Sequence, residues 1–172
     1  ILYDQKELDE NRVKLYFGNI PDGTVFLFRG WMFTESQYLT IWDWMILQGK
    51  GLLLVSPNQY MTMHYFSKSY DYIRPNFYTP RIITIPRIFL TSMNILRSAF
   101  KDYFIMKDDV KSVKGFDFPE KISCKITDDE LISLAEKFKE LRGKLFTGQY
   151  VLKQHVPLKK YNGHTNEYRV FY

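Results

Sequence analysis

The sequence predicts an α/β fold whose second half is α+β, and two patterns carry this prediction. In the first half, short apolar runs at 24–28 and 51–55 enclose a segment with helical spacing, which gives the order strand, helix, strand. In the second half, two apolar runs joined by a lysine-bearing turn precede an amphipathic helical segment. The 172 residues suffice for one domain or for two small ones.

Composition favours a well-packed chain with an anionic partner. Hydrophobic residues make up 45% and aromatic residues 17% of the chain, which excludes global disorder. The net charge of +5 suits a nucleotide, a nucleic acid or an acidic peptide without choosing among them. The single cysteine, Cys124, excludes an internal disulfide framework and favours a reducing, cytoplasmic compartment. No apolar run reaches transmembrane length, so we expect no membrane contact.

The first half is interpreted as a strand–helix–strand unit. The continuous apolar run at 24–28 is typical of a strand that is covered on both faces. Thr34 and Gln37 have the spacing of a capping box, and apolar residues then recur at helical spacing. A second apolar run at 51–55 closes at 56–58. We expect a right-handed parallel crossover, which is the simplest connection between two such strands.

Polar residues follow both of these strands. Ligands bind at the carboxyl ends of strands in open sheets, so Arg29 and Asn58 lie where a ligand is expected. Arg29 is a candidate for anion binding, with a buried structural arginine as the alternative. Residues 59–90 have no clean pattern beyond a strand at 79–86, and His64 among aromatic residues is interpreted as a packing residue. The interleaved tyrosines and arginines leave nucleic-acid contact open.

A strand–loop–strand unit with lysines at its mouth is the centre of the functional prediction. The apolar run at 103–106 delivers Lys107 on a strand, and Lys111 and Lys114 follow in the loop. Residues 122–126 return as a second strand. Ammonium groups and loop N–H groups suit a polyphosphate, whereas solvated loop lysines are the ordinary alternative.

Regular elements surround this unit. A short helix is predicted at about 92–100, and a capping box at 127–130 begins an amphipathic helix that ends near Gly143. The apolar stripe of that helix is interpreted as core; its members are Leu131, Leu134, Ala135, Phe138 and Leu141. A strand at 149–158 and a polar loop at 159–165 follow.

The chain ends in a predicted strand at 166–172. Glu167 and Arg169 share one face of it, because strand side chains alternate. They are either a cross-strand ion pair or a pair that brackets a phosphate and its metal.

The order of elements resembles the ATP-grasp fold, in which two subdomains clamp ATP and a smaller α/β domain precedes them. The motifs are similar to those of a phage-associated clade named for two arginines and a lysine. They follow that clade's order: Arg29-Gly30-Trp31-Met32, Ser56-Pro57-Asn58-Gln59-Tyr60, His64-Tyr65, residues 104–112 and residues 166–171. The resemblance implies a pre-ATP-grasp domain at 1–88 and a nucleotide-binding subdomain at 89–172, with the second subdomain incomplete or absent.

The resemblance also implies roles for the lysines and the hinge. Lys107 would contact the α- and β-phosphates of ATP, and Lys111 and Lys114 would lie in the loop that covers the phosphates. The main chain of Val151 and Leu152 would run past the adenine.

Further positions carry over less fully. Arg169, and Arg29 with it, would meet the γ-phosphate or the substrate carboxylate as catalytic residues, and Glu167 is a further nucleotide-binding candidate. The hinge strand has Lys153-Gln154-His155 where the clade has Arg-Glu-Phe, which puts a side-chain contact to the nucleotide in doubt at Lys153 and Gln154.

Magnesium is the second expected cofactor, but ATP-grasp ligases hold it mostly in the second subdomain, outside this chain. Asp108 and Asp109 are the only carboxylates near the phosphate loop, and neither is assigned to a metal.

The function implied by the resemblance is ATP-dependent ligation of a carboxylate and an amine, from small molecules or peptides, through an acylphosphate. A Walker A loop, a nucleophile elbow and a dinucleotide-binding glycine motif are absent from the sequence. Two alternatives stay open. The chain is a catalytically inactive nucleotide-binding or interaction module, or it is a basic nucleic-acid-binding protein.

Overall fold

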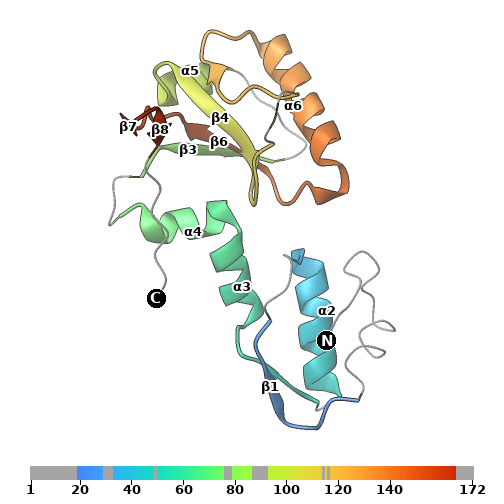
Figure 1. Cartoon of the computed structure of the whole chain (residues 1–172). Coiled ribbons are helices and arrows are strands. Elements are labelled where there is room, and N and C mark those ends of the chain that lie inside the picture. The colour runs from blue at the N-terminus through green and yellow to red at the C-terminus, as the bar shows by residue number, and fades with distance from the viewer. Residues whose placement is uncertain are drawn as a thin grey trace. The chain divides into compact units, whose positions relative to one another are not determined.

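The computed structural model describes residues 19–28, 33–48, 50–75, 79–86, 93–113, 115 and 117–165 (Figure 1). The chain divides into two compact units, Ile1–Phe77 and Tyr78–Tyr172. The second unit begins ahead of the domain boundary that we predict between residues 88 and 89. The assignment of the two domains as a pre-domain and a nucleotide-binding subdomain stays a prediction.

The first unit pairs two short parallel strands around a helix, as the strand–helix–strand pattern predicts. Strand β1 (Thr24–Phe26) pairs in parallel with β2 (Gly51–Leu53), and α2 (Glu35–Leu47) lies between them in the chain. The predicted capping box begins α2: the Thr34 side chain accepts from the Gln37 N–H, and the Gln37 side chain accepts from the Thr34 N–H.

The expectation that the strand at 24–28 is covered on both faces is wrong among the described residues, and its partner strand β2 is likewise exposed on one face. Phe26 and Leu53 pack on the core of the unit. Val25 and Leu52, which are register partners, face the other way and are 61% and 48% exposed. A continuous apolar run therefore indicates a strand here, but it does not indicate that both faces are buried, because the helices of this unit cover only one face.

Residues 57–73, which lack a clear sequence pattern, form two helices. Helix α3 (Pro57–His64) begins with a capping box between Ser56 and Gln59, and Pro57 occupies its first turn. Helix α4 (Phe66–Ile73) follows directly. Residues 56–58, which the sequence predicts as the end of the second strand, therefore also begin α3.

An aromatic cluster forms the core of the first unit. The rings of Tyr38 and Tyr60 stack with centroids 4.0 Å apart, and the Tyr60 hydroxyl accepts from the Phe33 N–H at 2.8 Å. Burial raises the pKa of Tyr60 to about 12. His64 lies against the Tyr60 ring at 4.2 Å, in the packing role that the sequence predicts.

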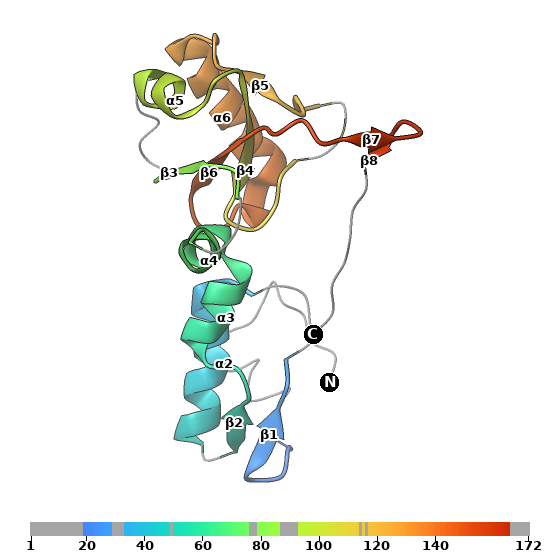
Figure 2. The ribbon, with the colours of Figure 1, turned by 90° about the vertical axis from the view of Figure 1, so that its left-hand side faces the viewer.

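The second unit is a four-stranded antiparallel sheet with helices on one side (Figure 2). Its strand order is β3-β6-β4-β5, and the strands are β3 (Ile82–Ile85), β4 (Tyr103–Asp108), β5 (Ile122–Ser123) and β6 (Tyr150–Gln154). The predicted strand–loop–strand unit is confirmed, because β4 pairs with β5, but its second strand ends at Ser123 and not at residue 126 as predicted. Helices α5 (Met93–Ala99) and α6 (Asp128–Arg142) contribute to the core over this sheet.

The two faces of this sheet differ in composition. Phe104 and Met106 of β4 lie beside Tyr150 and Leu152 of β6 in the helix-covered core. Alternation places the intervening residues on the opposite face. We call this opposite face the lysine face; its members are Ile82, Thr84, Ile105, Lys107, Val151 and Lys153.

The predicted amphipathic helix is α6. Its capping box joins Thr127 and Glu130, and Leu131, Ala135 and Phe138 are buried. Leu134 packs partly buried at the edge of the core. Leu141, in the last turn, is 42% exposed, so the buried stripe ends earlier than predicted.

Two features of the second unit complete the fold. Cys124 follows β5 and is buried in the core. The predicted polar loop at 159–165 is instead a hairpin of β7 (Lys160–Tyr161) and β8 (His164–Thr165). Asn162 and Gly163 in its turn have φ of 50° and 79°, the positive values that a tight two-residue hairpin turn requires.

Candidate functional site

Two lysines from neighbouring strands meet on the lysine face. In the antiparallel register of β4 and β6, Lys107 lies opposite Val151, and Lys153 lies opposite Ile105. Lys107 and Lys153 are therefore diagonal neighbours, a relation that places long side chains within reach of one another. Both side chains are half-buried. The sequence predicts the strand that delivers Lys107 but not the register that brings Lys153 beside it.

The electrostatics of this pair favour a negative partner. Burial lowers the pKa of Lys107, and the positive charge of Lys153 lowers it further. The carboxylates of Asp108 and Asp109 act in the opposite direction but are smaller influences. Because burial and like charge both penalise the ammonium form, an anion held beside the two lysines would stabilise it.

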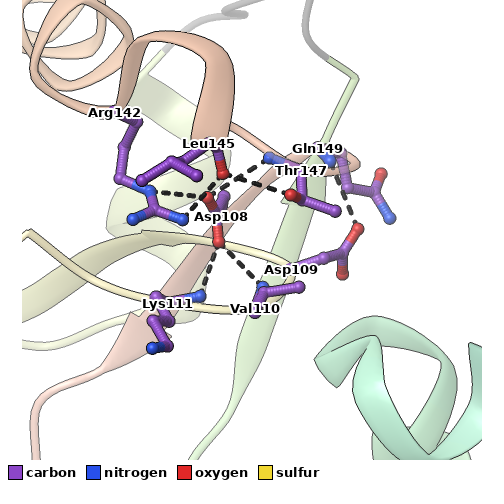
Figure 3. Close-up of polar contacts among 8 residues, drawn as sticks. All are labelled: Asp108, Asp109, Val110, Lys111, Arg142, Leu145, Thr147 and Gln149. Carbon is purple, nitrogen blue, oxygen red and sulfur yellow. Dashed lines mark hydrogen bonds and ion pairs between the residues drawn. The ribbon is translucent and has the colours of Figure 1, made fainter. Parts of the chain in front are cut away.

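A tight turn begins at Asp108, the last residue of β4 (Figure 3). Asp108 is fully buried, and its Oδ1 accepts hydrogen bonds from the N–H groups of Val110 at 2.8 Å and Lys111 at 2.6 Å. The Asp108 N–H donates to the Lys111 carbonyl at 3.0 Å. These bonds fix the backbone of Lys111 beside the strand end, while its side chain is exposed.

The second oxygen of Asp108 joins the turn to α6. Asp108 Oδ2 accepts from Arg142 Nε at 2.8 Å and from the Thr147 N–H at 3.3 Å. Arg142 Nη2 also donates to the Leu145 carbonyl at 2.7 Å. Sequence reasoning missed this connection, because no motif or spacing links an aspartate on a strand to an arginine at the end of a later helix.

Asp109 has a comparable structural role. Its Oδ2 accepts from the Gln149 N–H at 3.2 Å. Gly148 lies against this carboxylate with a φ of 71°, and an added Cβ would overlap the Asp109 oxygen. The turn and the segment that leads into β6 therefore pack closely together.

The Asp108 carboxylate does not fit the role of a magnesium ligand. Oxygen ligands for Mg²⁺ need free lone pairs, whereas N–H and guanidinium groups surround the Asp108 carboxylate. Among the residues that the structure describes, no group of three or more His, Cys, Asp or Glu side chains could hold a metal ion.

The expected hinge lies in the middle of the sheet. Val151 and Leu152 belong to β6, which pairs with β3 on one side and β4 on the other. In such a strand the main-chain groups bond alternately to the two neighbours. Gln154 bonds to Arg81, the residue before the edge strand β3. Its N–H donates to the Arg81 carbonyl at 2.8 Å, and its side-chain oxygen accepts from the Arg81 N–H at 3.2 Å.

An aromatic corner lies where β6 ends. The His155 N–H donates to the Tyr103 carbonyl at 3.0 Å, and the two rings meet edge-on at 6.3 Å. The ammonium of Lys121 lies 4.4 Å from the centre of the Tyr103 ring.

Four predicted site residues lie outside the described residues: Arg29, Lys114, Glu167 and Arg169. The structure brings together Lys107 and Lys153 on one face, with the turn that carries Lys111 at the end of the same strand. No helix in the described part of the chain is long and apolar enough to cross a membrane.

Comparison with solved structures gives a related fold. No family model and no curated protein sequence matches the chain. The structure is similar to the crystal structure of N5-carboxyaminoimidazole synthetase from Staphylococcus aureus complexed with ADP, with a TM-score of 0.53 and 12% sequence identity. That enzyme is an ATP-grasp protein. The chain has a partial ATP-grasp fold.

The alignment with the synthetase covers only part of that enzyme. The alignment covers 92% of this chain but 36% of the synthetase chain, so this chain spans little more than a third of that enzyme's length. At 12% identity the likeness concerns the fold.

Proposed function

We propose that this chain binds ATP on the lysine face of its second unit and forms part of an ATP-dependent carboxylate–amine ligase. The observation that carries the proposal is the pairing of Lys107 and Lys153 on one half-buried sheet face. The fold likeness to a synthetase complexed with ADP supports the same ligand class.

In this proposal the lysines neutralise the phosphates. Lys107 and Lys153 would hold phosphate oxygens from the sheet, and Lys111 would reach them from the turn at the strand end. Lys114, Glu167, Arg169 and Arg29 keep the roles that the family resemblance implies, with the arginines at the γ-phosphate or the substrate carboxylate. The resemblance to the phage-associated clade rests on the sequence motifs alone.

The register refines where the adenine would lie. The main chain of Val151 and Leu152 already pairs on both sides within the sheet, and Gln154 bonds to Arg81 through both main chain and side chain. A base has free main-chain groups only where β6 leaves the sheet. The His155 N–H already donates to the Tyr103 carbonyl, so we propose adenine contacts beyond His155, near the Tyr103 ring, and not at residues 151 and 152.

The proposed reaction needs no protein nucleophile. A carboxylate oxygen attacks the γ-phosphorus of ATP, ADP leaves, and an amine then displaces phosphate from the acylphosphate to form the amide. Residues of this chain would contribute position and positive charge. The described residues do not fit a magnesium site, so the magnesium that we expect would need ligands from elsewhere.

Thermal unfolding with and without a non-hydrolysable ATP analogue tests the proposal. We expect the analogue to raise the Tm of the wild-type chain, and Lys107→Ala to weaken its binding at least about tenfold, since a charge-assisted contact to phosphate is lost. Lys137→Ala is the matched control, because Lys137 is exposed on α6. Equal shifts in the two variants would contradict the phosphate role.

The same material separates the alternatives. Nucleotide binding without turnover in an assay of acylphosphate or amide formation favours an inactive nucleotide-binding module. Salt-sensitive binding of oligonucleotides that the ATP analogue does not compete favours a nucleic-acid-binding protein.

A further inference from the structure

We infer that Asp108 is a positioning residue, which fixes Lys111 relative to Lys107 and so sets the preference of the site for a polyphosphate over a monophosphate. The inference rests on the proposed nucleotide-binding function and deepens it. Asp108 itself is buried and does not face the proposed ligand.

The alternation of β4 separates the two roles. Lys107 points to the lysine face, and Asp108 therefore points to the opposite, helix-covered side. A carboxylate buried on that side is costly unless it is fully hydrogen-bonded. Asp108 meets this requirement with four donors: two from its own turn, one from Arg142 at the end of α6 and one from Thr147 beyond that helix.

Each oxygen of Asp108 has a separate task. Oδ1 closes the turn by accepting hydrogen bonds from the N–H groups of Val110 and Lys111. This is an Asx-turn, in which an aspartate side chain bonds to the backbone that follows it. Oδ2 anchors that turn to Arg142 and Thr147. The backbone of Lys111 is thus tied to the end of α6 through one side chain.

The chemistry of the donors requires a carboxylate and not an amide. All four partners are N–H groups, and an ionised carboxylate is the side chain that only accepts. In Asp108→Asn the amide NH₂ would face two of these donors, whichever way it is turned. The turn would then lose one of its two anchors with almost no change in side-chain volume.

The consequence for binding follows from the place of the turn. Lys107 and Lys111 stand at its two ends, so the closed turn holds the two cation-bearing backbones at a fixed separation. Two cations at a fixed separation bind a chain of phosphates better than a single phosphate, because each neutralises a different group. If the turn loosens, we expect the contact of Lys111 with the further phosphates to weaken before the contact of Lys107.

The test compares affinities for a non-hydrolysable ATP analogue and for AMP by calorimetry. We expect Asp108→Asn to weaken binding of the analogue about tenfold and to leave the affinity for AMP nearly unchanged, since a charge-assisted contact is lost only at the further phosphates. Thr127→Ala is the control for simple destabilisation, because it removes the N-cap of α6 in the same unit. It should lower the Tm and leave the ratio of the two affinities unchanged.

A double-mutant cycle with Lys111→Ala tests whether Asp108 acts through that lysine. We expect Asp108→Asn to have no further effect on analogue binding in the Lys111→Ala chain, and to add to the loss in the Lys107→Ala chain. A loss that adds fully to Lys111→Ala, or an unchanged ratio of analogue to AMP affinity in Asp108→Asn, would overturn the inference.

Arg142→Lys supplies a second route if Asp108→Asn does not fold. It keeps the positive charge but loses the planar fork that bonds Asp108 and Leu145 together. We expect a smaller loss of analogue binding in the same direction, and an unchanged affinity ratio would overturn the inference. Wild-type chain that binds neither ligand would overturn the proposed function as well, whereas binding that depends on Lys107 but not on Asp108 would overturn the positioning role alone.

Discussion

The two faces of the four-stranded sheet are made by the same strands but differ in what they contact. On β4, Phe104 and Met106 pack in the core with the helices, whereas Ile105 and Lys107 lie on the lysine face. Residues that are neighbours in sequence therefore belong to different environments. Adjacent substitutions on one strand can therefore separate effects on folding from effects on ligand binding.

The largest difference between the faces is expected at Phe104 and its neighbour. Phe104→Ala removes a fully buried ring from the core and should lower the free energy of unfolding by about 3–5 kcal/mol. Tyr103→Ala alters a side chain that is 40% exposed and should cost about 1 kcal/mol or less. Urea unfolding of the two variants measures both values. Similar losses would mean that the faces do not differ as the structure has them.

Substitutions where the turn after β4 packs against Gly148 should cost as much stability as substitutions in the core. Gly148→Ala adds a methyl group against the Asp109 carboxylate at a positive φ, and we expect a loss of about 3 kcal/mol in unfolding free energy. Gly163→Ala is the control, because Gly163 also has a positive φ but open space around it. Its cost should stay near about 1 kcal/mol in the same urea experiment. Equal losses of unfolding free energy in the two variants would mean that the positive φ accounts for the whole effect and that contact with Asp109 contributes nothing.

The smallest effect on stability is expected on the lysine face, and it depends on pH. The pKa of Lys107 is lowered from 10.5, so the folded chain binds this proton less tightly than the unfolded chain. The charged lysine therefore costs stability at neutral pH, and the cost disappears as the pH rises through the folded pKa toward 10.5.

Lys107→Met isolates this contribution. We expect the variant to be slightly more stable than wild type at neutral pH, and the difference to shrink as the pH rises toward 10.5. Urea unfolding of both chains across this pH range measures the difference. A gap that is constant with pH would show that ionisation of Lys107 does not contribute.

The parts of the fold that local chemistry decides could be predicted from the sequence. The capping boxes at Thr34 and Thr127 predict the starts of α2 and α6, because each box involves residues only three apart. Ser56 and Gln59 have the same spacing and begin α3, but Pro57 between them also fits the end of a strand, so this helix start is not predicted. The polar composition of residues 159–165 likewise predicts a loop, whereas Asn162 and Gly163 form the turn of a hairpin.

The site shows where such prediction ends. Lys107 was found because it follows an apolar run directly. Its neighbour Lys153 depends on how β4 and β6 pair, and the ion pair of Asp108 with Arg142 depends on where α6 ends over the sheet. Register and tertiary packing are properties of the folded chain, so no local pattern reports them.

The one thiol of the chain provides a reporter for motion of the sheet edge. Cys124 is 5% exposed, burial raises its pKa, and its N–H and carbonyl bond to Asp102 and Arg97. Alkylating reagents need an accessible thiolate, so they would react here only when the segment after β5 opens. The rate of that single modification would therefore time local opening residue-specifically, with no engineered label.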